Sequence, residues 1–240
     1  MIKAVVFDLD DTLISEKEYV LSGFRTVSKT ISFRYNLDFE KVYEKMIVLF
    51  NESSQKVFNR ILKNFDIEYS KEDIVNLISI YRQHEPKIKF YDDVIPTINK
   101  IKKMGIKIGI ITDGYKETQR RKIKALRCEE LFDEIIITDE FGREFWKPHE
   151  RAYRIIAEKL DVKLHEMIYV GDNETKDFVG ANRLNINTVK INRLNGVYRN
   201  LNLSKEFNAK YEIRNIIDLI NLIREEERIN DEKNIIYNYC

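Results

Sequence analysis

Three acidic side chains fall within four residues near the start of the chain, in the run Asp8-Leu9-Asp10-Asp11-Thr12. The run directly follows Ala4-Val5-Val6-Phe7, a short apolar segment typical of a strand that is buried on both faces. Carboxylates this close repel one another, and a divalent cation would offset the repulsion. A capped turn is the alternative, but a cap needs one such side chain rather than three. The cluster favours a metal or phosphoryl site at a carboxyl strand end.

A second acidic cluster, Gly171-Asp172-Asn173-Glu174-Thr175-Lys176-Asp177, also follows a strand-like run. Asp172 stands at the carboxyl end of that run, as Asp8 does at the end of the first. Asp177 lies near the first turn of an expected helix. Carboxylate oxygens suit Mg²⁺, which usually keeps several waters and a substrate phosphate among its ligands. By itself the cluster is equally compatible with a capped loop that carries surface acids.

Two shorter motifs carry groups that bind anions. Thr112-Asp113-Gly114 ends another strand-like run, and a hydroxyl with free backbone N–H groups before a helix makes a seat for an anion. Thr-Asp-Gly is also an ordinary turn. Lys147-Pro148 precedes an expected helix, where proline is favoured on structural grounds and a lysine is usually solvated.

Short β-branched runs with helical segments between them must position these motifs. Strand–helix alternation of this kind predicts an α/β fold with a Rossmann-like parallel sheet and right-handed crossovers. The spacing of apolar residues predicts crossover helices over 93–104 and 149–160. The runs expected to be strands are 4–7, 106–111, 135–137, 167–170 and 188–191.

The interval between the first two runs has no convincing strand. Its apolar spacing predicts one or two amphipathic helices over 39–65 and another over 71–82. We therefore expect a helical insertion packed above the sheet; the alternative is extra helices of the same domain. The expected parts are a catalytic core formed by 1–15 and 89–224, a helical domain at 16–88, and a C-terminal tail at 225–240.

Composition narrows the functional class. The 240 residues are 43% hydrophobic, enough for a buried core, and 41 basic against 40 acidic residues leave a net charge of +1. Such a balance provides no global field for nucleic acid or acidic lipid, and no apolar run approaches the ~20 residues of a membrane helix. Two cysteines, Cys128 and Cys240, show no pairing pattern. We expect a cytoplasmic protein, monomeric or homodimeric, with neither nucleic acid nor membrane as a partner.

The four motifs occur in the order Asp-x-Asp-x-Thr, Thr-Asp-Gly, Lys-Pro, Gly-Asp-x-x-x-x-Asp. In this order the chain resembles the haloacid dehalogenase (HAD) superfamily of phosphohydrolases over nearly its whole length. The helical insertion resembles the small helical cap domain of that superfamily. The resemblance implies a HAD-like core and a Mg²⁺-dependent phosphatase that acts on a small phosphorylated metabolite.

The resemblance also implies a role for each matching residue. Asp8 would attack phosphorus and form an aspartyl-phosphate, and Asp10 would protonate the leaving alcohol and then activate water. Asp8, the backbone carbonyl of Asp10, and Asp172 would hold Mg²⁺. Lys147 would neutralise the nucleophile and the transferring group, and Asp177 would orient Lys147 or a metal-bound water. The residues implied to bind the phosphoryl group are Thr12, Thr112, Asp113, Gly114 and Lys147.

Two further features narrow the reaction. Asp10 argues against a dehalogenase, where no alcohol needs a proton. The run 112–123, and 171–177 followed by Gly180-Ala181, are similar to N-acylneuraminate 9-phosphatases and related sugar phosphatases, which implies a sugar or sugar-acid phosphate. Asp11 departs from the family, where glycine is common at this position. The alternatives are a phosphomutase of the β-phosphoglucomutase type, which shares all four motifs, and a non-catalytic partner-binding protein.

Overall fold

The computed structural model describes residues 1–194, 204–226 and 228. The chain divides into two compact units. One comprises Met1–Ser15 and Lys89–Cys240, and the other comprises Glu16–Ile88. Among the described residues, no helix is both long enough and apolar enough to cross a membrane.

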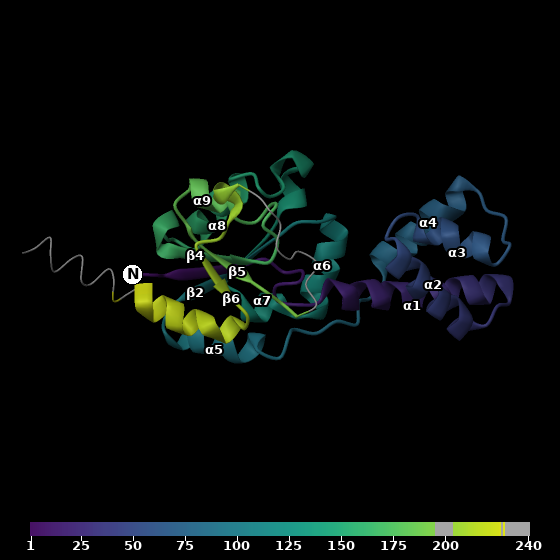
Figure 1. Ribbon diagram of the computed structural model, residues 1–240, viewed down its shortest axis with the longest axis horizontal. Helices are drawn as coiled ribbons and strands as arrows, with labels where there is room; N and C mark the ends of the chain where they lie inside the picture. Colours follow the sequence, from purple (N-terminus) through teal and green to yellow (C-terminus); the bar gives the residue numbers. More distant parts are fainter. Residues whose placement is uncertain (195–203, 227, 229–240) are drawn as a thin grey trace, which may run out of the picture. The chain divides into compact units, whose positions relative to one another are not determined.

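The first unit is built on a six-stranded sheet in which every neighbouring pair of strands is parallel (Figure 1). The strand order is β3-β2-β1-β4-β5-β6, so β1 lies inside the sheet between β2 and β4. The predicted α/β fold with a parallel sheet is confirmed. The strands are β1 (Ala4–Phe7), β2 (Lys107–Thr112), β3 (Glu134–Ile137), β4 (Met167–Gly171), β5 (Asn187–Ile191) and β6 (Tyr211–Ile213).

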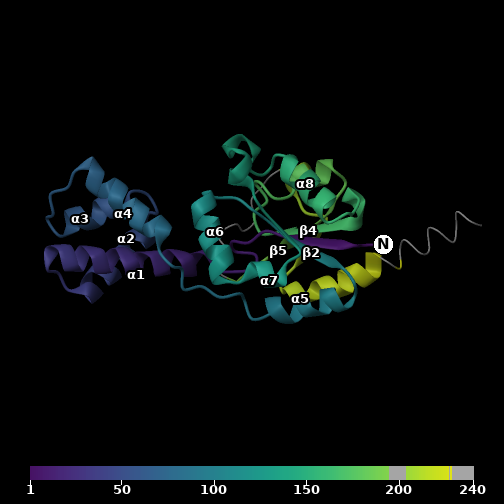
Figure 2. The same ribbon diagram turned by 180° about the vertical axis from the view of Figure 1, so that it is seen from behind.

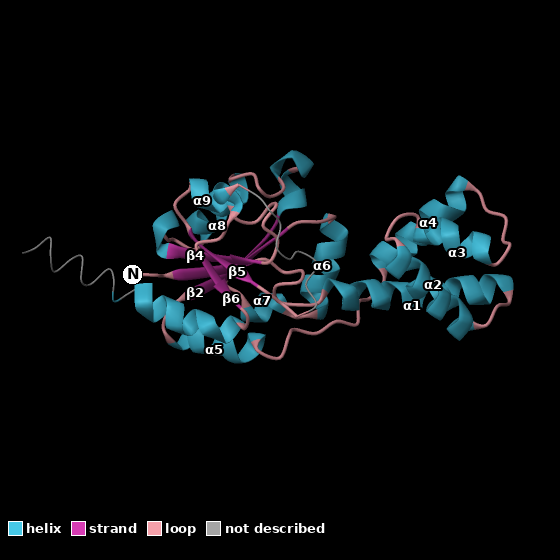
Figure 3. Cartoon of the chain, viewed as in Figure 1, coloured by secondary structure: helices cyan, strands magenta, loops and turns pink. Residues whose placement is uncertain are grey.

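Helices cover both faces of this sheet (Figures 2 and 3). Every side chain of β1 is buried, as an all-apolar strand between two helical layers requires. Ala4 and Val6 face one layer, where they share a core with Tyr153 and Ile156 of α8. The α-helices of this unit are α5 (Val94–Lys103), α6 (Lys116–Ala125), α7 (Cys128–Leu131), α8 (Arg151–Lys159) and α9 (Val179–Arg183). Its 3₁₀ turns are Thr138–Phe141, Arg143–Phe145, Leu164–Glu166, Lys205–Phe207 and Ile216–Asp218.

The second unit contains helices and has its own apolar core. Asp38 caps the second helix by accepting from the backbone N–H of Lys41 at 2.9 Å, and Ser70 forms a capping box with Asp73 at the start of the fourth. The interval expected to hold one or two helices over 39–65 holds two. The helices are α1 (Glu16–Tyr35), α2 (Phe39–Glu52), α3 (Val57–Asn64) and α4 (Lys71–Gln83).

Two features near the C-terminus were absent from the predicted elements. Strand β6 extends the sheet beyond β5, and residues 219–226 form a helix that includes the first two positions of the expected tail. Glu226 in this helix accepts hydrogen bonds from Lys210 at 2.8 Å and from Tyr211. Of the rest of the expected tail, residue 228 is described, whereas 227 and 229–240, which include Cys240, lie outside the described residues. Cys128 is a buried free thiol.

Candidate active site

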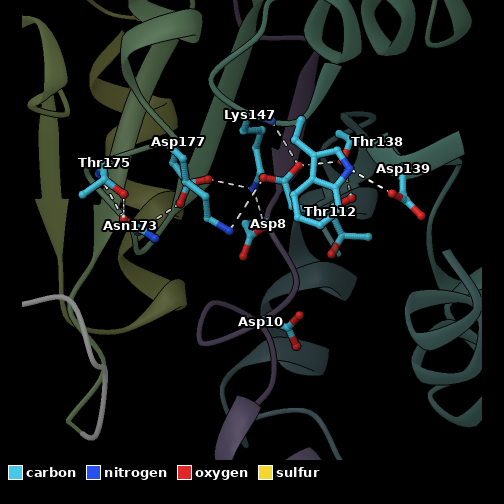
Figure 4. A network of polar contacts seen from close by, with 12 residues as sticks. Asp8, Asp10, Thr112, Thr138, Asp139, Lys147, Asn173, Thr175 and Asp177 are labelled. Carbon is cyan, nitrogen blue, oxygen red and sulfur yellow. Dashed lines mark hydrogen bonds and ion pairs between the residues drawn. The ribbon is translucent and has the colours of Figure 1, made fainter. Parts of the chain in front are cut away.

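Three of the predicted site residues lie at the carboxyl ends of three adjacent strands, and two of them, Asp8 and Thr112, are labelled in Figure 4. Asp8 directly follows β1, Thr112 is the last residue of β2, and Asp172 directly follows β4. Because β1 pairs in parallel with both β2 and β4, these three residues lie at the same end of the sheet, where the strands have their carboxyl ends. The strand ends therefore bring Asp8 together with two side chains that are each more than a hundred residues away in the sequence.

Lys147 lies at the centre of this group. Its Nζ is fully buried and donates to an Asp8 carboxylate oxygen, to Asp177 Oδ1 at 2.7 Å and to the Tyr169 hydroxyl at 3.0 Å. The Tyr169 hydroxyl donates in turn to Asp177 Oδ1 at 3.2 Å, and the Asn173 N–H donates to Asp177 Oδ2 at 2.9 Å. One buried cation is thus shared between the predicted nucleophile and the predicted supporting aspartate.

The backbone around Lys147 is held by Asp113. Asp113 Oδ1 accepts from the Lys147 N–H at 3.2 Å and from the Thr138 hydroxyl at 2.6 Å. Lys176 Nζ lies 3.8 Å from the other Asp113 carboxylate oxygen. The sequence implied that Asp113 contributes to phosphate binding. Its carboxylate instead contacts the segment that carries Lys147, so any contact with an anion would have to come from its backbone.

A close backbone approach fixes the next residue. Pro148 follows a cis peptide bond, and its carbonyl oxygen lies against Gly180 of α9. A Cβ at Gly180 would come within 2.2 Å of that oxygen, so only glycine fits. This contact joins the segment that carries Lys147 to the helix that follows Asp177.

Three buried carboxylates surround the position where a cation would bind. One carboxylate oxygen from each of Asp8, Asp172 and Asp177 lies within 4.8 Å of the others. Burial raises the pKa of Asp172 to about 9, assisted by the negative charges of Asp177 and Asp8. Burial also raises the pKa of Asp8 to about 6, even though Lys147 acts in the opposite direction. The negative charges of ionised Asp8 and Asp172 are therefore not fully balanced by nearby positive groups, and a dication that prefers oxygen ligands would supply the missing positive charge.

Asp177 differs from its two neighbours. Burial acts to raise its pKa, but the charges of Lys147 and Lys176 and hydrogen bonds from Lys147 and Asn173 outweigh burial and lower it. Both of its carboxylate oxygens already accept hydrogen bonds. Asp8 and Asp172 are consequently the better candidates to hold a metal; the resemblance implied both of them together with the backbone carbonyl of Asp10.

The Asp10 carboxylate lies away from this group, beyond Asp8 on the same loop (Figure 4). Lys122 Nζ donates to both Asp10 oxygens at 2.7 Å, and Gln119 Nε2 donates to Asp10 Oδ2 at 3.0 Å. Gln119 also donates to the Thr112 hydroxyl oxygen. The sequence reasoning assigned no role to Gln119 or Lys122. Their three-residue spacing shortly after Thr-Asp-Gly was the available signal, because two side chains with that spacing share one face if the segment is a helix.

Arg193 fixes the loop that carries Thr12. The Thr12 carbonyl accepts from Arg193 Nη2 at 2.8 Å and Nε at 3.1 Å, and the Arg193 guanidinium pairs with both Asp93 oxygens at 2.8 and 2.9 Å. The Thr12 hydroxyl is buried and has no hydrogen-bond partner within the part of the chain that the structure describes. A buried hydroxyl of this kind is suited to a ligand that supplies an acceptor.

Backbone conformation explains two residues of the motifs. Asp11 adopts φ +53°, a left-handed conformation that aspartate tolerates better than most residues, so the departure from glycine keeps the turn. Gly114 adopts φ +126°, and a Cβ there would lie 3.3 Å from the Gln119 side chain. Gly114 therefore gives the chain both its turn and the close approach of Gln119.

The sequence of this chain is similar to those of known phosphohydrolases. The family model described as "Haloacid dehalogenase-like hydrolase" matches residues 5–191. A glyceraldehyde 3-phosphate phosphatase of Methanocaldococcus jannaschii is 32% identical over 231 residues, which cover 93% of this chain and 98% of the relative. Pyrophosphatase PpaX of Bacillus mycoides is 30% identical over 195 residues, which cover 79% of this chain and 83% of the relative.

Solved structures show the same fold. A HAD phosphatase from Thermococcus onnurineus superposes with a TM-score of 0.60 at 28% identity, covering 92% of this chain and 98% of that one. A putative β-phosphoglucomutase from Thermotoga maritima has a TM-score of 0.62 at 17% identity, a likeness that concerns the fold alone.

Proposed function

The chain belongs to the haloacid dehalogenase-like hydrolase family, and from this premise we propose that it hydrolyses a small phosphate monoester through an aspartyl-phosphate on Asp8. That the chain is a hydrolase acting on phosphate esters follows from its family and from relatives named as phosphatases. One observation carries the proposed mechanism: buried Lys147 contacts both Asp8 and Asp177, with Asp172 beside them.

In the first half-reaction an Asp8 carboxylate oxygen forms a bond to phosphorus while the bond from phosphorus to the ester oxygen breaks. Lys147 contacts Asp8 and offsets the negative charge that collects when a carboxylate meets a phosphate. The leaving alkoxide takes a proton from Asp10 and departs as the alcohol.

In the second half-reaction Asp10, now ionised, removes a proton from water. The water oxygen attacks phosphorus, the bond to Asp8 breaks, and inorganic phosphate leaves. Asp10 has its proton back, and Asp8 is again a free carboxylate. The same residue thus serves as acid and then as base, as reversible protonation allows.

A divalent metal is part of the proposal. Asp8, Asp172 and the backbone carbonyl of Asp10 would hold Mg²⁺, because the under-compensated pair of carboxyl groups matches an oxygen-preferring dication. When bound, the ion would supply positive charge next to the transferring phosphoryl group. Lys147 remains in place through Asp113 and Asp177, so positioning of the nucleophile does not depend on the ion alone.

The proposed substrate is a short-chain phosphate monoester, with glyceraldehyde 3-phosphate the first to test. Two relatives that cover at least 93% of this chain are named as phosphatases of that triose phosphate, at 32% and 30% identity. A triose phosphate fits within the broader class of sugar phosphates that the sequence implied. The unit Glu16–Ile88 is proposed to be the cap of the family, which its separate apolar core and its insertion between β1 and β2 support.

Release of inorganic phosphate across a panel of esters tests the proposal. The panel contains glyceraldehyde 3-phosphate, larger sugar phosphates, sugar-acid phosphates and pyrophosphate, each assayed with Mg²⁺ and with chelator. We expect turnover of the triose phosphate with Mg²⁺, none with chelator, and none with Asp8→Asn. Asp92→Asn, at an exposed aspartate, is the matched control and should behave as the parent.

Two outcomes of this assay would contradict the proposal. Turnover that persists in Asp8→Asn would remove the nucleophile. Isomerised sugar phosphate without release of inorganic phosphate would indicate a phosphomutase instead.

A further inference from the structure

The Asp10 carboxylate is held by a buried lysine and a buried glutamine. Lys122 Nζ lies 2.7 Å from each Asp10 oxygen, and its side chain is 3% exposed. Gln119 Nε2 lies 3.0 Å from Asp10 Oδ2, and Gln119 is 1% exposed. Both residues belong to α6, which begins at Lys116, with one residue between it and the motif Thr112-Asp113-Gly114. We call Gln119 and Lys122 the α6 clamp.

Burying a lysine is costly unless its charge is paired and hydrogen-bonded, and an apolar side chain would fill the same space without that cost. Lys122 lies on the buried face of α6 next to Ile123, while Lys124 on the same helix is exposed. The helix thus carries one lysine turned inward to Asp10 and another available for comparison in solvent.

Gln119 links Asp10 to Thr112. When Asp10 is ionised its carboxylate can only accept, so the Gln119 amide presents its NH₂ group, whose two hydrogens serve Asp10 Oδ2 and the Thr112 hydroxyl oxygen. Because a Thr112 lone pair is occupied in this way, its own O–H hydrogen is free to point toward another acceptor. A phosphoryl oxygen would be such an acceptor.

We propose that Lys122 and Gln119 are positioning residues. They hold the Asp10 carboxyl group at a fixed position relative to the Thr112 hydroxyl, which is proposed to bind the phosphoryl group, so that Asp10 reaches the leaving-group oxygen. This inference rests on the proposed function, in which Asp10 is the acid and base. Proton transfer requires hydrogen-bond reach, and a displacement of about 1 Å can cost about 10²-fold in rate. Because both clamp residues share one helix, its packing sets the position of acid and phosphate seat together.

Leaving-group chemistry provides a readout that a purely structural role would not move. An alkyl ester such as glyceraldehyde 3-phosphate needs a proton on its departing oxygen, whereas p-nitrophenyl phosphate releases a stable phenolate that needs none. The parameter kcat/KM reports the steps up to departure of the leaving group. It therefore isolates the protonation step from the later attack of water.

The experiment compares Lys122→Met, Lys122→Arg and the matched control Lys124→Met on both esters with Mg²⁺. For Lys122→Met we expect kcat/KM to fall about 10- to 100-fold on the alkyl ester and to change less than about twofold on the aryl ester. Lys122→Arg should recover part of the loss, and Lys124→Met should match the parent on both. Equal losses on the two esters, or no loss on either, would overturn the inference.

A parallel measurement on Asp10→Asn separates this inference from the proposed function. If Asp10→Asn loses the alkyl reaction selectively and Lys122→Met does not, only the positioning role fails. If neither variant discriminates between the esters, the assignment of Asp10 as the acid fails. Unfolding of each variant in urea accompanies the kinetics. A Lys122→Met protein without a cooperative unfolding transition is misfolded, and Gln119→Leu then takes its place in the same comparison of the two esters. In a variant that unfolds cooperatively, equal loss on both esters overturns the inference.

Discussion

Replacing Lys147 with methionine removes the cation shared by Asp8 and Asp177 and keeps a long side chain in its place. The lysine makes three buried contacts, to Asp8, to Asp177 and to the Tyr169 hydroxyl. In Lys147→Met the two carboxyl groups stay buried and lose their nearest positive charge. The variant therefore measures how strongly the site depends on that one ammonium group.

The pKa of Asp8 sets the scale of the effect. It is raised from 3.8 to about 6, chiefly by burial, although Lys147 lowers it, and at about 1.4 kcal/mol per pKa unit this corresponds to about 3 kcal/mol against the ionised form. Removing one partner of a buried ion pair typically destabilises a protein by about 3–5 kcal/mol. We expect a loss of that size in the free energy of unfolding at pH 8, and a fall of about 10²–10³-fold in kcat.

The loss should depend on pH with a defined sign. In Lys147→Met the folded-state pKa values of both carboxyl groups rise above their unfolded values, so the folded state retains protons that the unfolded state releases. Such a group stabilises the fold at low pH, and that contribution is lost as pH rises through the folded-state pKa. The difference from the parent should therefore be small near pH 4 and greatest at pH 8.

Urea unfolding at pH 4.5, 6 and 8 measures this difference, with chelator present so that metal does not contribute. Lys159→Met is the matched control, because Lys159 makes a single ion pair with Glu134 at 2.9 Å and is half exposed. We expect the control to change by at most about 1 kcal/mol at any pH. If Lys147→Met were no less stable than this control at pH 8, or if its loss were independent of pH, the description of the buried cluster would be wrong.

Two further predictions follow from the same geometry. Mg²⁺ should bind more tightly as pH rises from 6 to 9, with release of protons, because Asp172 has a pKa of about 9 and must ionise to serve as a ligand. Calorimetry in buffers of different ionisation enthalpy measures both the affinity and the protons released, and an affinity that does not change between pH 6 and 9 would contradict the prediction. Gly180→Ala should lower stability by about 1–3 kcal/mol and also lower kcat, because its Cβ would lie 2.2 Å from the Pro148 carbonyl oxygen. Thermal unfolding tests the second prediction, and an unchanged midpoint would speak against the close approach.

Strand positions were predictable where the local sequence was decisive. β1 and β4 are apolar runs that are followed at once by acidic residues, so both their burial and their carboxyl ends could be predicted. Three-residue β6 contains Glu212 and gives no such signal; it forms because β5 offers an open edge. The helix α1 was not predicted either, since Gly23 and several polar residues interrupt its apolar spacing, and its closeness to Tyr81 is a tertiary requirement.

The same distinction applies to the site. The proximity of Asp8 and Asp172 could be predicted from the sequence, because the carboxyl ends of parallel strands lie at the same end of a sheet. The role of Asp113 in holding the Lys147 backbone, and of Lys122 in holding Asp10, could not be predicted in this way. Both depend on how a loop or a helix returns to the sheet, and no local pattern encodes contacts that span 34 and 112 residues.

The most direct test of the account is to identify the residue that carries phosphate during turnover. Asp10→Asn is mixed with Mg²⁺ and p-nitrophenyl phosphate, quenched in acid within milliseconds, reduced with tritiated borohydride and digested for mass spectrometry. We expect a burst of nitrophenolate and tritium-labelled homoserine at position 8, because hydride reduces the acyl carbon of the aspartyl-phosphate and inorganic phosphate leaves. Full turnover without label on the protein, or label on any residue other than Asp8, would contradict it.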